Sequence, residues 1–317
     1  MDDRRPGGPG SRRDILRLGL AVPLVAAGST SIRAAARQSP ANAREANKAV
    51  VLAYLQACDQ GDVAAMNAVI AAGATWWIVG RRDYDRSTIM AINAGRYKPD
   101  GSRRSTILGI AAEADRVALE YETATVERGV TRYRVYHHLF IVRNGAIHAA
   151  REYLDPPPLA QPFTVSQAHP PGGVPWVARA VNTKTEAQTR EVALAFLTGS
   201  TPLPKELRSP QFRWWVTGYG YHDLDDYLTK LQDIMRSAPG PREAPVFPTT
   251  RDMSITVEGE RAAVHLVKDT IFPNYDYANR FHMVVLVRDG KVVELREHND
   301  LGAAIRGGLP VTEAMRT

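Results

Sequence analysis

Two histidines and two glutamates recur at one spacing and form the chemically most informative pattern of the chain. Glu152 follows His137 after fifteen residues, and Glu297 follows His282 after the same interval. An imidazole beside a carboxylate can hold a proton ready for transfer near neutral pH. The two pairs therefore indicate acid–base chemistry, such as proton abstraction next to a carbonyl, dehydration or ring closure, with no metal or organic cofactor.

Each pair is predicted to lie across a β-hairpin. Asn144-Gly145 and Asp289-Gly290 are typical of two-residue type I′ turns, in which both central residues take positive φ. If strand pairing continues from these turns without interruption, each histidine faces its glutamate, with Cβ atoms about 5 Å apart. Alternation then places both pairs on an apolar sheet face. There they either transfer protons in a pocket or satisfy each other and stabilise the sheet.

Further candidate residues surround the two pairs. Lys268 falls on the same predicted face as His282 and Glu297, so we expect the site around Glu297 to be the better developed. The ammonium would favour the ionised form of Glu297 and could steady an enolate, unless it reaches solvent at the strand end. Candidates for substrate binding, each also compatible with a plain core or surface position, are Trp77, Trp215, Tyr84, His222, Tyr121 and Asn279.

An internal repeat organises these residues. Residues 113–155 align with 258–300 without a gap at an offset of 145, and Trp76-Trp77 matches Trp214-Trp215 upstream. A period this long describes two whole domains rather than a solenoid. We place the first copy at 44–156, a Pro- and Gly-rich linker at 157–184, the second copy at 185–304 and a C-terminal tail at 305–317.

Each copy combines helices with strands. Val117, Leu119 and Tyr121 alternate with polar residues, the spacing of a strand with one buried face. The predicted order is helix, short strand, helix and then a strand meander, which is an α+β pattern. The opposite sheet face, predicted to carry Met283 and Val285 beside charged residues, suggests that the two copies pack through their sheets as a pseudo-dimer.

These motifs resemble the SnoaL-like polyketide cyclase group of the nuclear transport factor 2-like (NTF2-like) superfamily. The residues that carry the resemblance are Asn279–His282, Val287–Val292 and Arg296–Asp300, with Tyr136–Asp155 repeating the pattern in the first copy. The resemblance implies two tandem cone-shaped α+β domains, each a curved, mainly antiparallel sheet wrapped around helices.

The same resemblance implies a pocket for a small, hydrophobic, oxygenated ligand. In the cyclases a histidine works with an acidic residue on the following strand, which corresponds here to the two His–Glu pairs, with Glu in place of Asp. The superfamily includes isomerases, dehydratases and epoxide hydrolases, and also non-catalytic binders. A cofactor-free lyase or isomerase is therefore the first hypothesis, and a periplasmic binding protein is the alternative.

The first 37 residues are typical of an export signal. Ser11–Arg17 contains the pair Arg12-Arg13 and resembles the twin-arginine motif, and the apolar stretch Leu16–Ala27 is too short to span a membrane. We therefore predict a cleaved signal at 1–37 and a periplasmic or secreted protein. The alternative is a disordered arginine-rich tail.

Composition excludes several classes of partner. The net charge of +6 is concentrated in the first 37 residues, which hold seven arginines and three aspartates, so the remainder carries only +2. A nucleic-acid-binding domain would keep its basic residues in the folded part. No apolar run is long enough for stable membrane insertion of the mature protein. The lone Cys58 allows no intramolecular disulfide and is predicted to be a buried, inert thiol.

Overall fold

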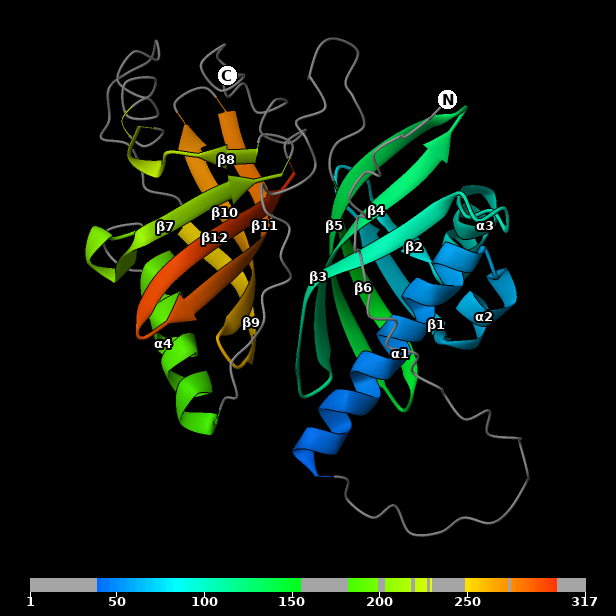
Figure 1. The fold of residues 1–317 in the computed structure, drawn as a ribbon, viewed down its shortest axis with the longest axis horizontal. Coiled ribbons are helices and arrows are strands. Elements are labelled where there is room, and N and C mark those ends of the chain that lie inside the picture. The colour runs from blue at the N-terminus through cyan, green and yellow to red at the C-terminus, as the bar shows by residue number, and fades with distance from the viewer. Residues whose placement is uncertain are drawn as a thin grey trace, which may run out of the picture. The chain divides into compact units, whose positions relative to one another are not determined.

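The computed structural model describes residues 39–154, 182–198, 203–217, 220–226, 229, 249–272 and 275–300 (Figure 1). These residues form two six-stranded sheets with helices packed on them. The predicted signal, nearly all of the predicted linker and the C-terminal tail lie outside the described residues. Among the described helices, none is long and apolar enough to cross a membrane.

The first copy alternates short helices with six strands. Its elements are α1 (Pro40–Gln60), α2 (Val63–Ala68), β1 (Ile70–Ile78), β2 (Asp83–Asp85), α3 (Arg86–Arg96), β3 (Arg103–Glu113), β4 (Arg116–Glu127), β5 (Val130–Arg143) and β6 (Ala146–Leu154). The strand order is β2-β1-β6-β5-β4-β3. Only the β1–β6 pairing in this sheet is parallel.

The second copy repeats this topology strand for strand. Its elements are α4 (Thr183–Thr198), the short 3-10 helix η1 (Lys205–Leu207), β7 (Arg208–Val216), β8 (Gly220–His222), β9 (Thr249–Glu258), β10 (Arg261–Phe272), β11 (Tyr275–Arg288) and β12 (Lys291–Asn299). The order β8-β7-β12-β11-β10-β9 equals that of the first sheet, again with one parallel pairing, between β12 and β7. The predicted α+β class and its tandem repetition are confirmed.

Capping residues fix the helices of the first copy. Ser39 and Asp62 accept backbone hydrogen bonds at the starts of α1 and α2, and Asp85 does the same for α3. Helix α1 ends at Gly61, whose φ of 64° favours glycine. A Cβ there would also lie 2.3 Å from the carbonyl carbon of Lys98, so the residue must be glycine for two reasons.

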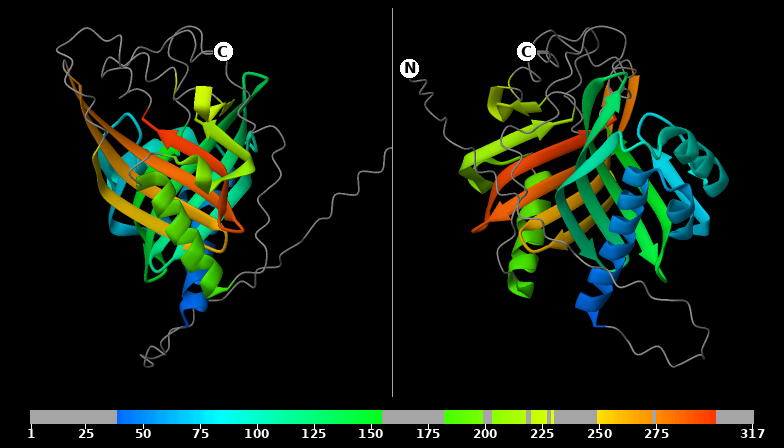
Figure 2. Two further views of the ribbon diagram at one scale, coloured as in Figure 1. Left: turned by 90° about the vertical axis from the view of Figure 1, so that its left-hand side faces the viewer. Right: turned by 45° about the vertical axis from the view of Figure 1, so that its right-hand side comes forward.

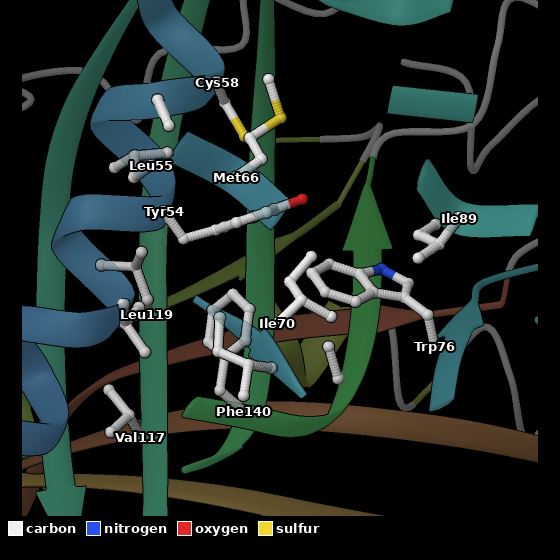
Figure 3. Close-up of a cluster of buried hydrophobic side chains, with 14 of the residues drawn as sticks. Tyr54, Leu55, Cys58, Met66, Ile70, Trp76, Ile89, Val117, Leu119 and Phe140 are labelled. Carbon is white, nitrogen blue, oxygen red and sulfur yellow. The ribbon is translucent and has the colours of Figure 1, made fainter. Parts of the chain in front are cut away.

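Each sheet has one apolar face covered by its own helices. In the first copy, side chains of α1, α2 and α3 pack on the sheet around Tyr54, Trp76 and Phe140 (Figure 3). In the second copy, Phe196 of α4 packs against the face that carries Leu266, and Figure 2 shows α4 lying along that sheet. We call these two surfaces the core faces. The predicted buried positions Val117, Leu119 and Tyr121 of β4 lie on the first of them, as expected.

Both β-hairpins begin as predicted but change register shortly after the turn. The turn residues Asn144-Gly145 and Asp289-Gly290 all have φ between 51° and 74°, as a type I′ turn requires. A β-bulge then inserts one extra residue, His148 in β6 and Val293 in β12. Every later pair is displaced by one residue, so β5 and β11 present opposite faces from those predicted.

Contacts between the two sheets occur in equivalent pairs. The amide of Ala112 donates to Glu258 Oε2 at 2.8 Å, and the amide of Val257 donates to Glu113 Oε2 at 3.0 Å. Both donors and both acceptors are related by the offset of 145. Each copy thus contributes one amide donor and one carboxylate acceptor at equivalent positions.

Helices α1 and α4 extend this reciprocal pattern. Lys48 of α1 forms an ion pair with Glu258, and Arg190 of α4 forms one with Glu113, so each helix contributes a cation to the opposite copy. Arg44 of α1 and Glu186 of α4 also form an ion pair with each other, at 2.7 Å.

Candidate functional site

A buried carboxylate on the core face of the first copy has three polar side-chain partners. Glu152 of β6 accepts from Arg96 Nη1 at 2.8 Å and from Trp76 Nε1 at 3.1 Å. The Nε2 atom of His138 lies 3.4 Å from Oε2 of the same carboxylate. The guanidinium comes from the last residue of α3, the indole from β1 and the imidazole from β5. Three elements thus converge on one side chain.

His138 presents its second ring nitrogen without a partner. Its Nδ1 atom is buried and forms no hydrogen bond within the part of the chain that the structure describes. The ring stacks on Phe140 at a centroid distance of 5.0 Å and on Tyr121 at 5.6 Å. Aromatic packing therefore holds the imidazole in one orientation, with one nitrogen facing Glu152 and the other free.

Arg96 joins a tyrosine to the same group. Its Nη2 atom donates to the hydroxyl oxygen of Tyr136 at 2.9 Å, which leaves the phenol proton available for another acceptor. Tyr136 stacks on Tyr121 at 5.2 Å with an interplanar angle of 8°. We refer to Glu152, His138, Arg96, Trp76 and Tyr136 as the Glu152 cluster.

The Glu152 cluster keeps its carboxylate ionised. Burial by itself would raise the pKa of Glu152, but the charge of Arg96 and the contact with His138 outweigh burial and hold that pKa well below its ordinary range. Glu152 is therefore suited to orient an imidazole and to stabilise its cation, rather than to donate a proton at neutral pH.

The equivalent carboxylate of the second copy has different surroundings. Glu297 accepts from Asn299 Nδ2 at 2.8 Å. Burial raises the pKa of Glu297, and the opposing charge of Lys268 is too weak to reverse this. Burial also lowers the pKa of Lys268, whose Nζ lies 5.4 Å from the ring centroid of Phe281. The position equivalent to His138 is occupied by Met283.

The predicted His–Glu pairs are wrong because of the two β-bulges. His137 faces Tyr153, and it is His138 that faces Glu152. His282 faces His298 rather than Glu297. Both predicted histidines lie on the sheet face opposite the core, so Lys268, His282 and Glu297 do not converge.

The face assignment along β11 is corrected for the same reason. Met283 and Val285 belong to the apolar core of the second copy, not to an outer face. Along β12, Leu295 is in the core of the second copy, while Arg296 contacts the first copy.

In each tryptophan pair, the residue that faces the core is not the one proposed for substrate binding. Trp76 and Trp214 are the core residues. Trp77 instead lies under the guanidinium of Arg280 at 5.0 Å, and Trp215 packs with Leu108 and Val135 of the first copy. Adjacent strand residues point to opposite faces, and the sequence did not indicate which indole faces inward.

The remaining predicted binding residues are distributed as follows. Tyr121 lies on the first core face, as predicted, and Tyr84 is partly buried against the same core. Tyr84 and His222 are paired with Trp76 and Trp214 respectively, so their equivalence holds, but the His222 side chain lies outside the description. Asn279 bonds through its amide to the backbone of Asp300, a structural tie between strand ends.

Two other expectations concern metals and the cysteine. Within the described residues, no group of three or more His, Cys, Asp and Glu side chains is placed to hold a metal ion. Cys58 is buried, and burial raises the pKa of its thiol to about 12. The prediction of an inert buried thiol is confirmed.

Comparison with known proteins locates a family match in the first copy. Residues 51–150 match the family described as SnoaL-like domain. A putative SnoaL-like polyketide cyclase from Jannaschia sp. CCS1 is 15% identical with a TM-score of 0.32, over 37% of this chain and 91% of that one. An LEH-like epoxide hydrolase from M. tuberculosis is 19% identical with a TM-score of 0.32, over 35% of this chain and 84% of that one.

Bal32a, from a soil-derived mobile gene cassette, is 24% identical with a TM-score of 0.31, over 36% of this chain and 92% of that one. No curated protein matches the chain. The family match spans Trp76, Arg96 and His138 of the Glu152 cluster. Because the second sheet has the same strand order, the chain is consistent with two tandem NTF2-like domains.

Proposed function

We propose that the Glu152 cluster carries out cofactor-free acid–base chemistry on a small, hydrophobic, oxygenated molecule, in an isomerisation, dehydration or cyclisation. The observation that supports this most is the free Nδ1 of buried His138, opposite a ring nitrogen that faces an ionised carboxylate. A base oriented by a third group is the usual arrangement for proton transfer. A SnoaL-like domain supports small-molecule binding or cyclase and isomerase chemistry.

In this proposal His138 Nδ1 accepts a proton from a carbon next to a carbonyl or from a hydroxyl. Glu152 stabilises the imidazolium that forms, and Arg96 keeps the carboxylate ionised. The Tyr136 hydroxyl, which already accepts from Arg96, donates to the substrate oxygen as negative charge develops there. The imidazolium then returns the proton at a second atom. The base is thus a histidine oriented by Glu152, not Glu297.

Non-catalytic binding is the second candidate, and the second copy favours it. Met283 stands where the first copy has His138, so the second core face has no imidazole at that position. A buried Lys268 near Glu297 still offers polar groups that can orient an oxygenated ligand.

One experiment separates the two functions. Ligands that co-purify with the chain are identified by native mass spectrometry and returned to purified wild type, His138→Asn and Glu152→Gln. Catalysis predicts product from wild type and a rate loss of about 10²–10⁴-fold in both variants, with binding retained. Recovery of unchanged ligand from all three proteins would instead support the binding function.

We also propose that the two copies pair as the subunits of a homodimer would, which makes the chain a pseudo-dimer. The reciprocal contacts of Glu113 and Glu258 support this proposal.

Finally, we propose export through the twin-arginine pathway to the periplasm or beyond. The paired Arg12 and Arg13 and the concentration of positive charge ahead of the first helix support this.

A further inference from the structure

A second buried carboxylate lies on the face of the first sheet opposite the core. Glu120 of β4 is 0% exposed. It accepts from Arg261 Nη2 at 2.7 Å and from Arg296 Nη1 at 2.9 Å, and His298 Nε2 lies 3.2 Å from its other oxygen. All three partners belong to the second copy. Burial would raise the pKa of Glu120, but Arg296 and the other partners hold it well below its ordinary range.

The offset of 145 relates this site to a second, chemically different one. Glu120 corresponds to His265, and His298 corresponds to Tyr153. The hydroxyl of Tyr153 lies 3.0 Å from Nδ1 of His265, so the same two positions meet on both sides of the interface. One side holds a carboxylate between two guanidinium groups, and the other holds a neutral hydrogen-bonded pair.

Arg261 depends on Glu120 more than Arg296 does. Among the described residues, Glu120 is the one hydrogen-bond acceptor of Arg261, whose Nε and Nη1 atoms are buried without partners. Arg296 also donates to Glu294 at 2.6 Å. Arg261 reaches Glu120 by lying against Gly109, where a Cβ would come within 2.2 Å of its Nη1.

We infer that Glu120 allows the sheet face of the second copy to pack on the first copy, because it neutralises the buried arginines of that face. The sheet faces of two second copies cannot pair with each other. In such a pairing the residue opposite Arg261, Arg296 and His298 would be His265. Arg261 would then be buried against imidazoles without a carboxylate partner in each copy, whereas Arg296 would keep its ion pair with Glu294. Unpaired buried charge is strongly unfavourable. This inference rests on the proposed pairing of the two copies, and it is independent of the proposed catalysis.

The test measures how close the two copies stay in the full-length mature chain. Arg44→Cys and Glu186→Cys are introduced together, since these residues are partly exposed and lie in contact across the interface. A short bismaleimide then reports the pairing, because buried Cys58 does not react. The crosslinking yield of this double-cysteine chain is compared with the yields of three variants made in it. The variants are Glu120→Gln, Glu120→Gln/Arg261→Met and Glu113→Gln. Molecular mass is measured in parallel by light scattering.

Glu120→Gln is expected to lower the crosslinking yield more than about tenfold, because it leaves Arg261 buried without a counterion. Glu120→Gln/Arg261→Met should recover much of the yield, and Glu113→Gln, at the partly exposed rim, should change it little. The Glu120→Gln chain, in which the two copies have separated, should stay monomeric as the protein concentration is raised.

Normal crosslinking that is insensitive to Glu120→Gln would overturn the role of Glu120 while leaving the pairing intact. A drop with no recovery in the double variant would show that Glu120 does not act through Arg261. Dimers of the opened chain joined through second copies would overturn the claim that this face cannot pair with itself. An absence of crosslinking in the parent chain would overturn the pairing and the role of Glu120 together.

Discussion

The imidazole rings of His137 and His282 stack with their centroids 3.9 Å apart and an interplanar angle of 8°. The two residues are equivalent in the repeat, so each copy contributes the same side chain to one contact. Both are fully buried, and none of their ring nitrogens has a partner within the described part of the chain. Burial, and then a neighbouring imidazole, lowers the pKa of each histidine well below its ordinary value.

This stack predicts that the chain loses stability in mildly acidic solution. A histidine whose pKa is lower in the folded state stabilises the fold above its unfolded pKa, about 6.5, and that contribution shrinks as the pH falls. His265 adds to the effect, because burial lowers its pKa to about 3. The free energy of unfolding from urea titrations should therefore be level above about pH 6.5 and should decrease steadily from there to pH 5.

The double variant His137→Phe/His282→Phe supplies the control. It removes two titrating groups and keeps two stacked aromatic rings, so the decline between pH 6.5 and 5 should become shallower. Glu152 and Glu120 remain ionised throughout this window because their pKa values are lowered. Equal slopes in wild type and the double variant would show that the stacked histidines do not cause the acid sensitivity.

A glycine comparison tests how tightly Arg261 is packed. Gly109→Ala places a Cβ within 2.2 Å of Arg261 Nη1, whereas a Cβ at Gly73, in the same sheet, meets nothing within 4 Å. Overpacking of a buried site costs about 1–3 kcal/mol. Chemical denaturation should show a loss of this size for Gly109→Ala and a change near zero for Gly73→Ala. Similar effects of the two substitutions would mean that the Arg261 side chain moves aside freely.

Export is tested with the conservative pair Arg12→Lys/Arg13→Lys. These changes preserve the charge of the segment while removing the paired guanidinium groups. The protein should then stay in the cytoplasm of an expressing bacterium, folded and uncleaved, while wild type appears in the periplasmic fraction. Fractionation and immunoblotting measure the distribution, with a general secretory protein as the control. Periplasmic protein in equal amounts from both would argue against the twin-arginine route.

Local signals in the sequence were sufficient for the architecture. Turn residues Asn144-Gly145 and Asp289-Gly290 have the positive φ that their types predict, because few other residues tolerate that geometry. The alternation of Val117, Leu119 and Tyr121 identified the core side of β4. The repeat at an offset of 145 anticipated two sheets of identical strand order.

The candidate site was less predictable because one extra residue changes every later contact. Nothing about His148 or Val293 in a β-propensity pattern marks them as bulges, and a one-residue shift moves a whole set of side chains to the other face. The order His137-His138 offered a hint, since either imidazole could face Glu152. Arg96 could not be found from spacing, because its contact with Glu152 joins residues 56 apart on a helix and a strand.

The exchange of His138 and Met283 tests which copy carries out chemistry. His138→Met gives the first copy the residue that the second copy already has, so the proposed base is lost while the apolar volume is largely kept. Turnover of the co-purified ligand should fall about 10²–10⁴-fold, and calorimetry should show binding of similar strength. Met283→His should not create activity, because burial raises the pKa of Glu297 and no arginine among the described residues pairs with that carboxylate. A gain of turnover from Met283→His, or full activity in His138→Met, would place the reactive base somewhere other than the Glu152 cluster.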